Sequence, residues 1–363
     1  LLANLFKKHN YGQQTTIGTV EHLKNPSLIE IRKYFNTYYV PNNMAVILSG
    51  DFNPDHAIAK IDKAFSYMKE KSVPEYTFAP EDAITSSVIK EVVGPDAESV
   101  TIAFRLPSNQ DKDAALANLV GSILTNGKAG LIDLNLVKKQ KLLKASAYSY
   151  LLVDHGLLYI SASPSQGQSL EDVKKLVLNE IENLKKGNFD DDLIPSIVNN
   201  IKKHKIQQTE SYGDRAYMLM DAFTGKLNWR DQVAYVNDLS KVTKKDIMDF
   251  ANKYFGNNYV AVLKHKGERT DIEKIEKPTI TPVETNADKQ SAFVKMINQM
   301  PSTPVAPVFL DYNKDLQRSK LGKAEVYYVQ NKENQLYRLN FRYKIGTLND
   351  LKMGLAAQYI QFL

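Results

Sequence analysis

Histidine, aspartate, glutamate and cysteine are the side chains that bind catalytic zinc, and this chain has six histidines and no cysteine. No two histidines lie three or four residues apart, so no helical turn would present two of them on one face. The zinc-binding pattern H-x-x-E-H is absent, because Gly18 stands where Glu21-His22 would need its first histidine. We therefore predict no catalytic and no metal-binding residue. We interpret every histidine as a surface or core residue: His9, His22, His56, His155, His204 and His265.

Two charged clusters stand out in the sequence. Asp190-Asp191-Asp192 precedes a predicted helix, where carboxylates stabilise the helix dipole. The run from Lys138 to Lys141 leads into a predicted strand and is interpreted as the solvated end of a helix, with a substrate contact as the alternative. The sequence has neither a G-x-S-x-G nucleophile motif nor a glycine-rich phosphate loop. Substrate-binding residues therefore stay unassigned.

Length and composition indicate an ordinary globular protein with more than one domain. A chain of 363 residues exceeds the usual size of a single hydrophobic core. No apolar run approaches the ~18 residues that a membrane-spanning helix needs. The net charge of +6 comes from lysines spread over predicted helices, which favours a solvated surface over a nucleic-acid surface. We expect neither a membrane span nor a nucleic-acid partner.

The stretch from Ser27 to Asp51 organises the chain. Ser27 with Glu30 three residues later predicts a capped helix start, and Pro41 ends the helix. The continuous apolar run 44–48 predicts a short strand buried on both faces. This stretch is therefore a helix–strand unit.

A second copy of this unit begins at Thr243. Across the turn, Asn42-Asn43 corresponds to Asn257-Asn258 after a change of one residue in the offset. A constant offset over many matched residue types indicates two related domains, each ending in a helix–strand unit. The matched helix residues are Ser27, Ile31, Tyr34, Tyr38 and Tyr39 in the first copy and Thr243, Ile247, Phe250, Tyr254 and Phe255 in the second.

A further related unit is indicated near the end of the sequence. Val100–Leu106 alternates apolar and polar residues like a half-buried strand, and a predicted helix ends at Ile123-Leu124. Leu336–Lys344 repeats the Phe-Arg strand, and a predicted helix runs to Phe362-Leu363. The further unit therefore begins near residue 321.

These patterns predict five segments. Residues 1–76 form the closing part of a first domain, and because the first residues resemble the tail of a helix, a preceding segment is expected. Residues 77–84 form a linker and residues 85–268 a second domain. The polar, proline-rich residues 269–320 form an interdomain linker, and residues 321–363 start a third domain.

The second domain is predicted to be α+β, with a meander of strands in an antiparallel or mixed sheet covered by helices on one face. Asp154-His155-Gly156 predicts the turn of a hairpin. Near Tyr212-Gly213 a long helical stretch should break, and one short helix, 290–300, is expected in the linker. The expected strands are 88–93, 100–106, 145–153 and 157–163, and the expected helices are 113–124, 131–143, 169–186 and 191–223.

Short motifs resemble the pitrilysin/insulinase-type zinc metallopeptidases, the inverzincins. The resemblance covers essentially the whole chain: the end of the catalytic domain, the non-catalytic second domain and the start of the third. For the first domain the motifs are His9-Asn10-Tyr11-Gly12, Thr16-Ile17-Gly18, His22-Leu23, Tyr38-Tyr39, Asn42-Asn43-Met44 and Ser49-Gly50-Asp51-Phe52. The later motifs, in forms common in bacterial members, are Gly167–Glu171, Trp229, Val242–Asp246, Phe309–Tyr312 and Asn334–Tyr337.

The resemblance implies a function for a longer parent protein rather than for this chain alone. In the family, the H-x-x-E-H motif and a later glutamate lie upstream of the loop that resembles His9–Gly12, so it assigns no catalytic or metal residue here. It implies that the parent binds zinc and cleaves peptides through a zinc-activated water. This chain would form chamber wall and substrate surface, with peptides or small unfolded proteins and the remaining parent domains as partners.

An alternative follows from the same resemblance. Some members of the family have lost the zinc motif and serve as assembly partners, so the parent could be a non-catalytic scaffold or binding subunit. Under both hypotheses this chain alone would be inactive and would bind no zinc. The resemblance also implies a bacterial periplasm or cell envelope as the location.

Overall fold

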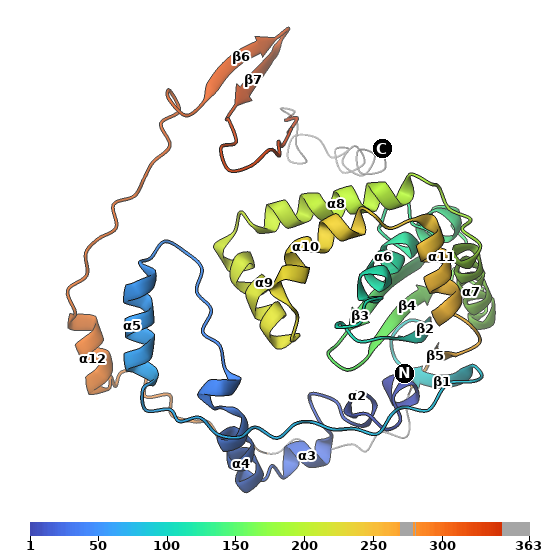
Figure 1. Ribbon diagram of the computed structural model, residues 1–363, viewed down its shortest axis with the longest axis horizontal. Coiled ribbons are helices and arrows are strands. Elements are labelled where there is room, and N and C mark those ends of the chain that lie inside the picture. The colour runs from blue at the N-terminus through green and yellow to red at the C-terminus, as the bar shows by residue number, and fades with distance from the viewer. Residues whose placement is uncertain (269–278, 280, 343–363) are drawn as a thin grey trace. The chain divides into compact units, whose positions relative to one another are not determined.

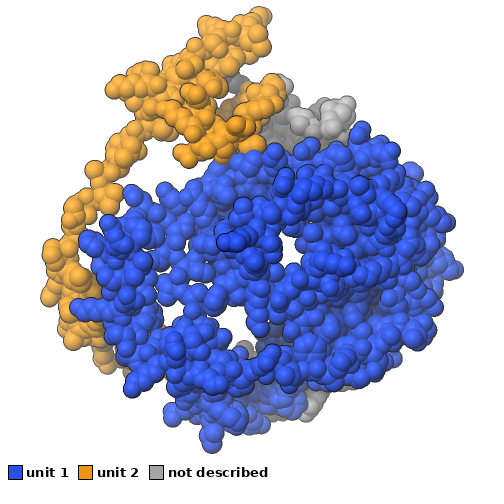
Figure 2. Space-filling view, viewed as in Figure 1, with its two compact units in different colours: residues 1–274 blue, residues 275–363 orange. Residues whose placement is uncertain are grey.

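The computed structural model describes residues 1–268, 279 and 281–342. The chain divides into two compact units, 1–274 and 275–363, which carry different colours in Figure 2. The first unit contains a five-stranded sheet with its helices, and the described residues of the second form a helix and a two-stranded sheet.

Short helices occupy the first 65 residues. Asparagine and serine side chains begin the two longest of them, because Ser27 Oγ accepts from Glu30 N and Asn53 Oδ1 from His56 N. The prediction of a strand at 44–48 was wrong, since these residues are not paired with any strand. The helices are α1 (Leu2–Leu5), α2 (Asn10–Gln13), α3 (Val20–Lys24), α4 (Leu28–Tyr38), the 3₁₀ turn η1 (Pro41–Asn43) and α5 (Pro54–Phe65).

The central sheet is mixed and has the strand order β1-β5-β2-β4-β3. Its strands are β1 (Val88–Gly94), β2 (Ser99–Leu106), β3 (Lys144–Leu151), β4 (Gly156–Ser163) and β5 (Tyr259–Lys266). The β3–β4 hairpin forms as predicted, with Tyr148 opposite Tyr159. The predicted meander was wrong at one point: β5 inserts between β1 and β2, parallel to β1 and antiparallel to β2.

Helices cover one face of this sheet, which confirms the α+β fold class (Figure 1). The predicted break in the long helical stretch lies between Gln208 and Tyr212. The helix predicted at 131–143 is shorter, because after Leu131-Ile132 the chain forms the π-helix η2 (Asp133–Val137) and then turns. The helices are α6 (Ala114–Leu124), α7 (Leu170–Lys185), α8 (Leu193–Gln208), α9 (Tyr212–Thr224), α10 (Trp229–Leu239) and α11 (Lys244–Tyr254).

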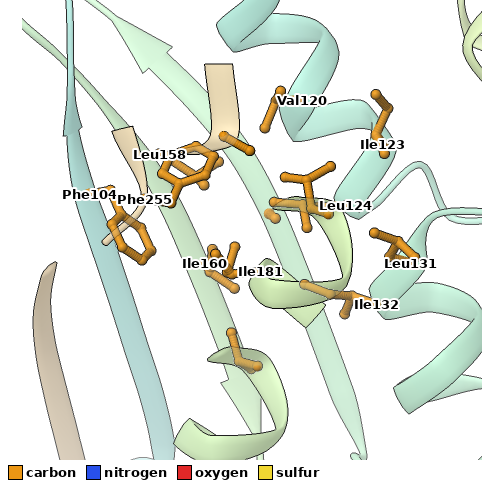
Figure 3. Packing of buried hydrophobic residues seen from close by; sticks show 14 of the residues in the cluster. Phe104, Val120, Ile123, Leu124, Leu131, Ile132, Leu158, Ile160, Ile181 and Phe255 are labelled. Carbon is orange, nitrogen blue, oxygen red and sulfur yellow. The ribbon is translucent and has the colours of Figure 1, made fainter. Parts of the chain in front are cut away.

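The main hydrophobic core lies between the sheet and α6, α7 and α11. Alternate residues of β2 and β4 point toward the helices, as a period of two requires. Figure 3 shows side chains from the sheet (Phe104, Leu158, Ile160) beside side chains from helical segments (Val120, Ile123, Leu124, Leu131, Ile132, Ile181). This core holds the sheet rigid beneath whatever packs on its other face.

The second unit has little buried surface among its described residues. It contains α12 (Ala292–Gln299), which confirms the predicted short helix, and a hairpin of β6 (Gln317–Leu321) and β7 (Ala324–Tyr328). The predicted strand 336–344 was wrong over 336–342, which are not in a strand, and its last residues and the helix predicted to run to Leu363 lie outside the described residues. In the described part of the chain, no helix has the length and apolarity to cross a membrane.

The two helix–strand units share their local hydrogen bonds. The Thr243 side chain begins α11 as Ser27 begins α4, by accepting from the amide three residues later. At the other end, Asn43 Nδ2 donates to Tyr38 O at 2.9 Å, and Asn258 Nδ2 donates to Tyr254 O at 3.1 Å. The sequence repeat therefore specifies the same turn twice.

The two helix–strand units differ in how far their apolar side chains are buried. Ile247 and Phe250 of α11 are 0% and 3% exposed, whereas Ile31 and Tyr34 at the matching positions of α4 are 54% and 61% exposed. Residues 44–48 correspond to the central strand β5 but have no neighbouring strand. The apolar residues of α4 and of this extended run thus correspond to buried residues in the second copy, but they are exposed in this chain.

Candidate functional site

The face of the sheet opposite the helices is partly covered by residues 1–13. Leu5 and Phe6 are fully buried there against a second hydrophobic cluster that includes Ala103, Leu157 and Val260. These sheet residues alternate with the core-facing ones, so the pleat places them on the opposite face. The beginning of the chain is therefore joined to the second domain by apolar packing.

One carboxylate organises the loop that follows. Glu81 accepts hydrogen bonds from the backbone N–H groups of Lys7 at 2.9 Å, Lys8 at 2.6 Å and His9 at 2.7 Å. Arg105 Nη2 lies 3.6 Å from Glu81 Oε2. Burial by itself would raise the pKa of the Glu81 carboxyl, but the three N–H groups and Arg105 hold it below its usual value. Glu81 is therefore a fixed anion that joins residues 7–9 to residues 76–82.

Arg105 joins the same two segments to strand β2. Its guanidinium donates to Asp82 O at 2.9 Å and to Leu5 O. It also lies over the Phe6 ring, 5.5 Å from the centroid. Burial lowers the pKa of Arg105, against the charges of Glu81 and Asp82, yet the guanidinium stays protonated at any physiological pH.

His9 is completely buried in this junction. Its Nδ1 accepts from Tyr11 N at 3.1 Å, so the neutral ring carries its proton on Nε2, which lies 3.3 Å from Asp154 Oδ2 in the β3–β4 turn. Tyr11 Oη also lies 3.3 Å from Asp154 Oδ2. The Phe78 ring packs edge-on against the imidazole, with centroids 4.4 Å apart. His9 thus connects its own segment to residues 76–82 and to the β3–β4 turn.

His155 lies beside His9, with ring centroids 5.1 Å apart. It stacks on Phe6 at 5.3 Å with an interplanar angle of 21°. Its Nε2 is buried and has no hydrogen-bond partner in the described structure. Burial, then the positive potentials of His9 and Arg105, lowers the pKa of His155 below 6.5. Its neutral form is therefore the one that fits the junction.

This histidine cluster, defined as His9, Tyr11, Glu81, Arg105, Asp154 and His155, binds segments of the chain together. Within residues 1–268 and the described part of 279–342, no group of three or more His, Asp or Glu side chains is arranged to hold a metal ion. Zinc therefore does not fit the described side chains, and no hydrolytic step can be derived from them.

The remaining residues singled out from the sequence are dispersed. His22 completes the capping box of α3 with Thr19, and His56 lies exposed in the first turn of α5. Asp191 pairs with Lys244 of α11 at 2.6 Å, and Asp190–Asp192 precedes α8 as predicted. The residues Lys138–Lys141 follow η2 near the surface, and His265 lies 3.5 Å from Glu91.

Sequence reasoning missed the meeting of His9 with His155. The two residues are far apart in sequence and follow no common period, so no helix or strand pattern could pair them. The only signal was the His9–Gly12 motif, which marked the loop without revealing its contacts.

Comparison with known proteins places this geometry in context. Residues 27–201 match the family described as the peptidase M16 inactive domain. A curated relative, "Zinc protease PqqE" of Helicobacter pylori, is 25% identical over 246 residues, which is 66% of this chain and 55% of the relative. The chain thus spans about half the length of the curated relative that it matches.

Two solved structures share the fold. A protease from Helicobacter pylori superposes with a TM-score of 0.67 at 23% identity, covering 73% of this chain and 66% of the other. A peptidase M16 inactive domain from Pseudomonas fluorescens gives a TM-score of 0.65 at 16% identity, covering 74% and 64%. At these identities the likeness establishes the fold.

Proposed function

We propose that this chain is a non-catalytic region of a zinc metalloendopeptidase that acts on peptides, because residues 27–201 match the family described as the peptidase M16 inactive domain. The observation that carries the proposal is this family match, made by residues among which no metal-binding arrangement occurs in the described structure. The helix-backed sheet is the wall of the chamber that encloses the substrate. The face of the sheet opposite the helices, called the open face below, is the surface that peptides contact.

Residues 1–76 are, in this proposal, the closing part of a catalytic-type domain, followed by a linker at 77–84 and the non-catalytic domain at 85–268. The exposed apolar residues of α4 and the unpaired run 44–48 support this division. Their counterparts in α11 and β5 are buried, because β5 is a strand of the five-stranded sheet and α11 packs on that sheet. Residues 269–320 link this half to a third homologous domain that starts at 321.

Zinc, in this proposal, is bound by other residues of a longer parent protein. The curated relative named as a zinc protease supports this assignment, because it is almost twice as long as the part that matches here. The remaining parent domains and peptide or small unfolded protein substrates are the partners. A bacterial periplasm or cell envelope is the proposed location.

The test combines zinc analysis, cleavage and binding on the chain as it stands. We expect zinc at the level of the reagent blank after incubation with excess ZnCl₂ and removal of free metal by dialysis, because the described histidines form no ligand set. A fluorophore–quencher peptide without stable structure should stay intact over hours. The same peptide should bind measurably by fluorescence anisotropy. One zinc per chain together with cleavage would overturn the proposal.

Absence of peptide binding would favour the second function, a scaffold or binding subunit without substrate contact. The variant Tyr148→Ser provides a local control, because Tyr148 is half exposed on the open face and stacks on Tyr159 at 5.1 Å. Weaker peptide binding by this variant would locate the contact on the open face. Equal binding by variant and wild type would place it elsewhere.

A further inference from the structure

The histidine cluster holds together four segments that are far apart in the sequence. Residues 5–11 and 76–82 both rest on the β3–β4 turn and strand β2, through the contacts of Glu81, Arg105 and Asp154 described above. Apart from the Phe6 cluster, most of these contacts are polar or ring contacts around two imidazoles. The docking of the two segments therefore depends in part on the charge of His155, which contacts Phe6 and Phe78 from these segments.

The charged groups around the imidazoles come from every segment packed there. The segment 1–13 contributes Lys7, Lys8 and His9, and the segment 76–82 contributes Glu81 and Asp82. The β3–β4 turn contributes Asp154 and His155, and β2 contributes Arg105. Lys8 is paired with Asp82 at 2.7 Å, Glu81 is satisfied by backbone N–H groups and Arg105, and Asp154 faces His9.

The carboxylates of Glu81 and Asp154 act on His155 and would raise its pKa, but burial and the positive potentials of His9 and Arg105 outweigh them. The ring of His155 stacks on Phe6 and contacts the ring of His9. The guanidinium of Arg105, which is always charged, also lies over Phe6. A proton added to His155 would place a positive charge on a half-buried ring near Arg105, with no hydrogen-bond acceptor for its buried Nε2 in the described structure. Such a charge is costly unless the ring reaches water.

We propose that the histidine cluster is a pH-sensitive clasp, which holds residues 1–13 and 76–82 on the sheet at neutral pH and releases them on acidification. The release is local, because the sheet keeps its separate core against α6, α7 and α11. Undocking lets His155 reach water and take up a proton. The inference rests on residues 1–155 and does not depend on the peptidase function.

The direction follows from proton linkage. His155 has a folded-state pKa below 6.5, so the undocked state binds more protons, and docking loses stability as the pH falls through 6.5 toward the folded-state pKa. One proton changes the opening equilibrium by up to about tenfold per pH unit in that window. His155 therefore drives release.

Hydrogen exchange measured by mass spectrometry on the whole chain, between pH 7.5 and 5.0 and corrected for the intrinsic pH dependence of exchange, tests the clasp. Wild type should show an opening constant for residues 1–13 and 76–82 that rises up to about tenfold per unit below pH 6.5. Strands β2 and β4 should keep their protection. His155→Phe keeps a ring against Phe6 and should abolish the pH dependence.

His56→Phe is the matched control, because His56 is exposed on α5 and lies outside the clasp. It should leave the pH response intact. If His155→Phe fails to fold, His155→Gln removes the same titration with a smaller polar side chain. A wild-type opening constant that does not change with pH, or an unchanged response in both His155 variants, overturns the proposal. So does an equal loss of protection in β2 and β4, since that is global acid unfolding.

Discussion

Phe6→Ala measures how strongly residues 1–13 are docked on the second domain. Phe6 is 1% exposed and packs with Leu5, Ala103, Leu157 and Val260. Removing a buried phenylalanine side chain costs about 3–5 kcal/mol where the surroundings cannot collapse. The nearby Arg105 guanidinium adds a cation–π contact of about 0.5–1 kcal/mol that would also be lost.

The full cost should appear as local opening rather than global unfolding. Residues 1–13 lie at the edge of the fold and can detach without disturbing the main core. At about 3 kcal/mol, the protection of their amides should fall on the order of 100-fold, because every 1.4 kcal/mol is a factor of ten. Protection in β2 and β4 should change by less than about threefold.

The assay is hydrogen exchange at pH 7.5, where the clasp is closed, with Phe35→Ala as the control. Phe35 lies on the open face of α4 and is 55% exposed, so the same chemical change should cost less than about 0.5 kcal/mol. Unchanged protection of residues 1–13 in Phe6→Ala would refute the packing argument. A parallel loss in β2 would mean that the segment is part of one cooperative unit.

Two further substitutions, each with a comparison variant, probe local rules in the second domain. Thr243→Ala removes the capping box of α11 and should destabilise the domain by about 1 kcal/mol in urea unfolding, whereas Ser27→Ala on exposed α4 should leave that transition unchanged; equal effects would contradict the role of α11 in the core. Gly187→Ala should cost about 1–3 kcal/mol, because φ is +69° and the new Cβ would lie 2.8 Å from Met248 Sδ. Gly127→Ala, with φ of +76° and open space, should cost only the backbone strain of about 1 kcal/mol, and an equal cost at both sites would show that the contact with Met248 is irrelevant.

Local patterns predicted most elements of the second domain. The alternation in Val100–Leu106 and the turn residues Asp154–Gly156 correctly predicted β2 and the β3–β4 hairpin. Capping residues and apolar spacing correctly predicted α7, since Ser169 accepts from Asp172 N and the apolar stripe is buried. These signals lie within a few residues of one another, so they act before any tertiary contact forms.

The same reasoning failed for strands, because a strand depends on pairing with distant parts of the chain. The apolar runs 44–48 and 259–263 are similar in sequence, yet only the second forms a strand, because a strand exists only where neighbours accept its hydrogen bonds. The hydrophobic pattern of the sequence also did not predict that β5 inserts between β1 and β2. Strand order is decided by contacts between distant parts of the chain.

The sequence by itself determined the repeat, the α+β class, the caps and turns, and the resemblance to the M16 peptidases, because each depends on residue types at short spacing. Only the tertiary structure decided that His9 and His155 meet on the open face of the sheet, with Glu81 and Arg105 beside them. Four segments converge there through burial and charge, and neither leaves a periodic signal in the order of the residues.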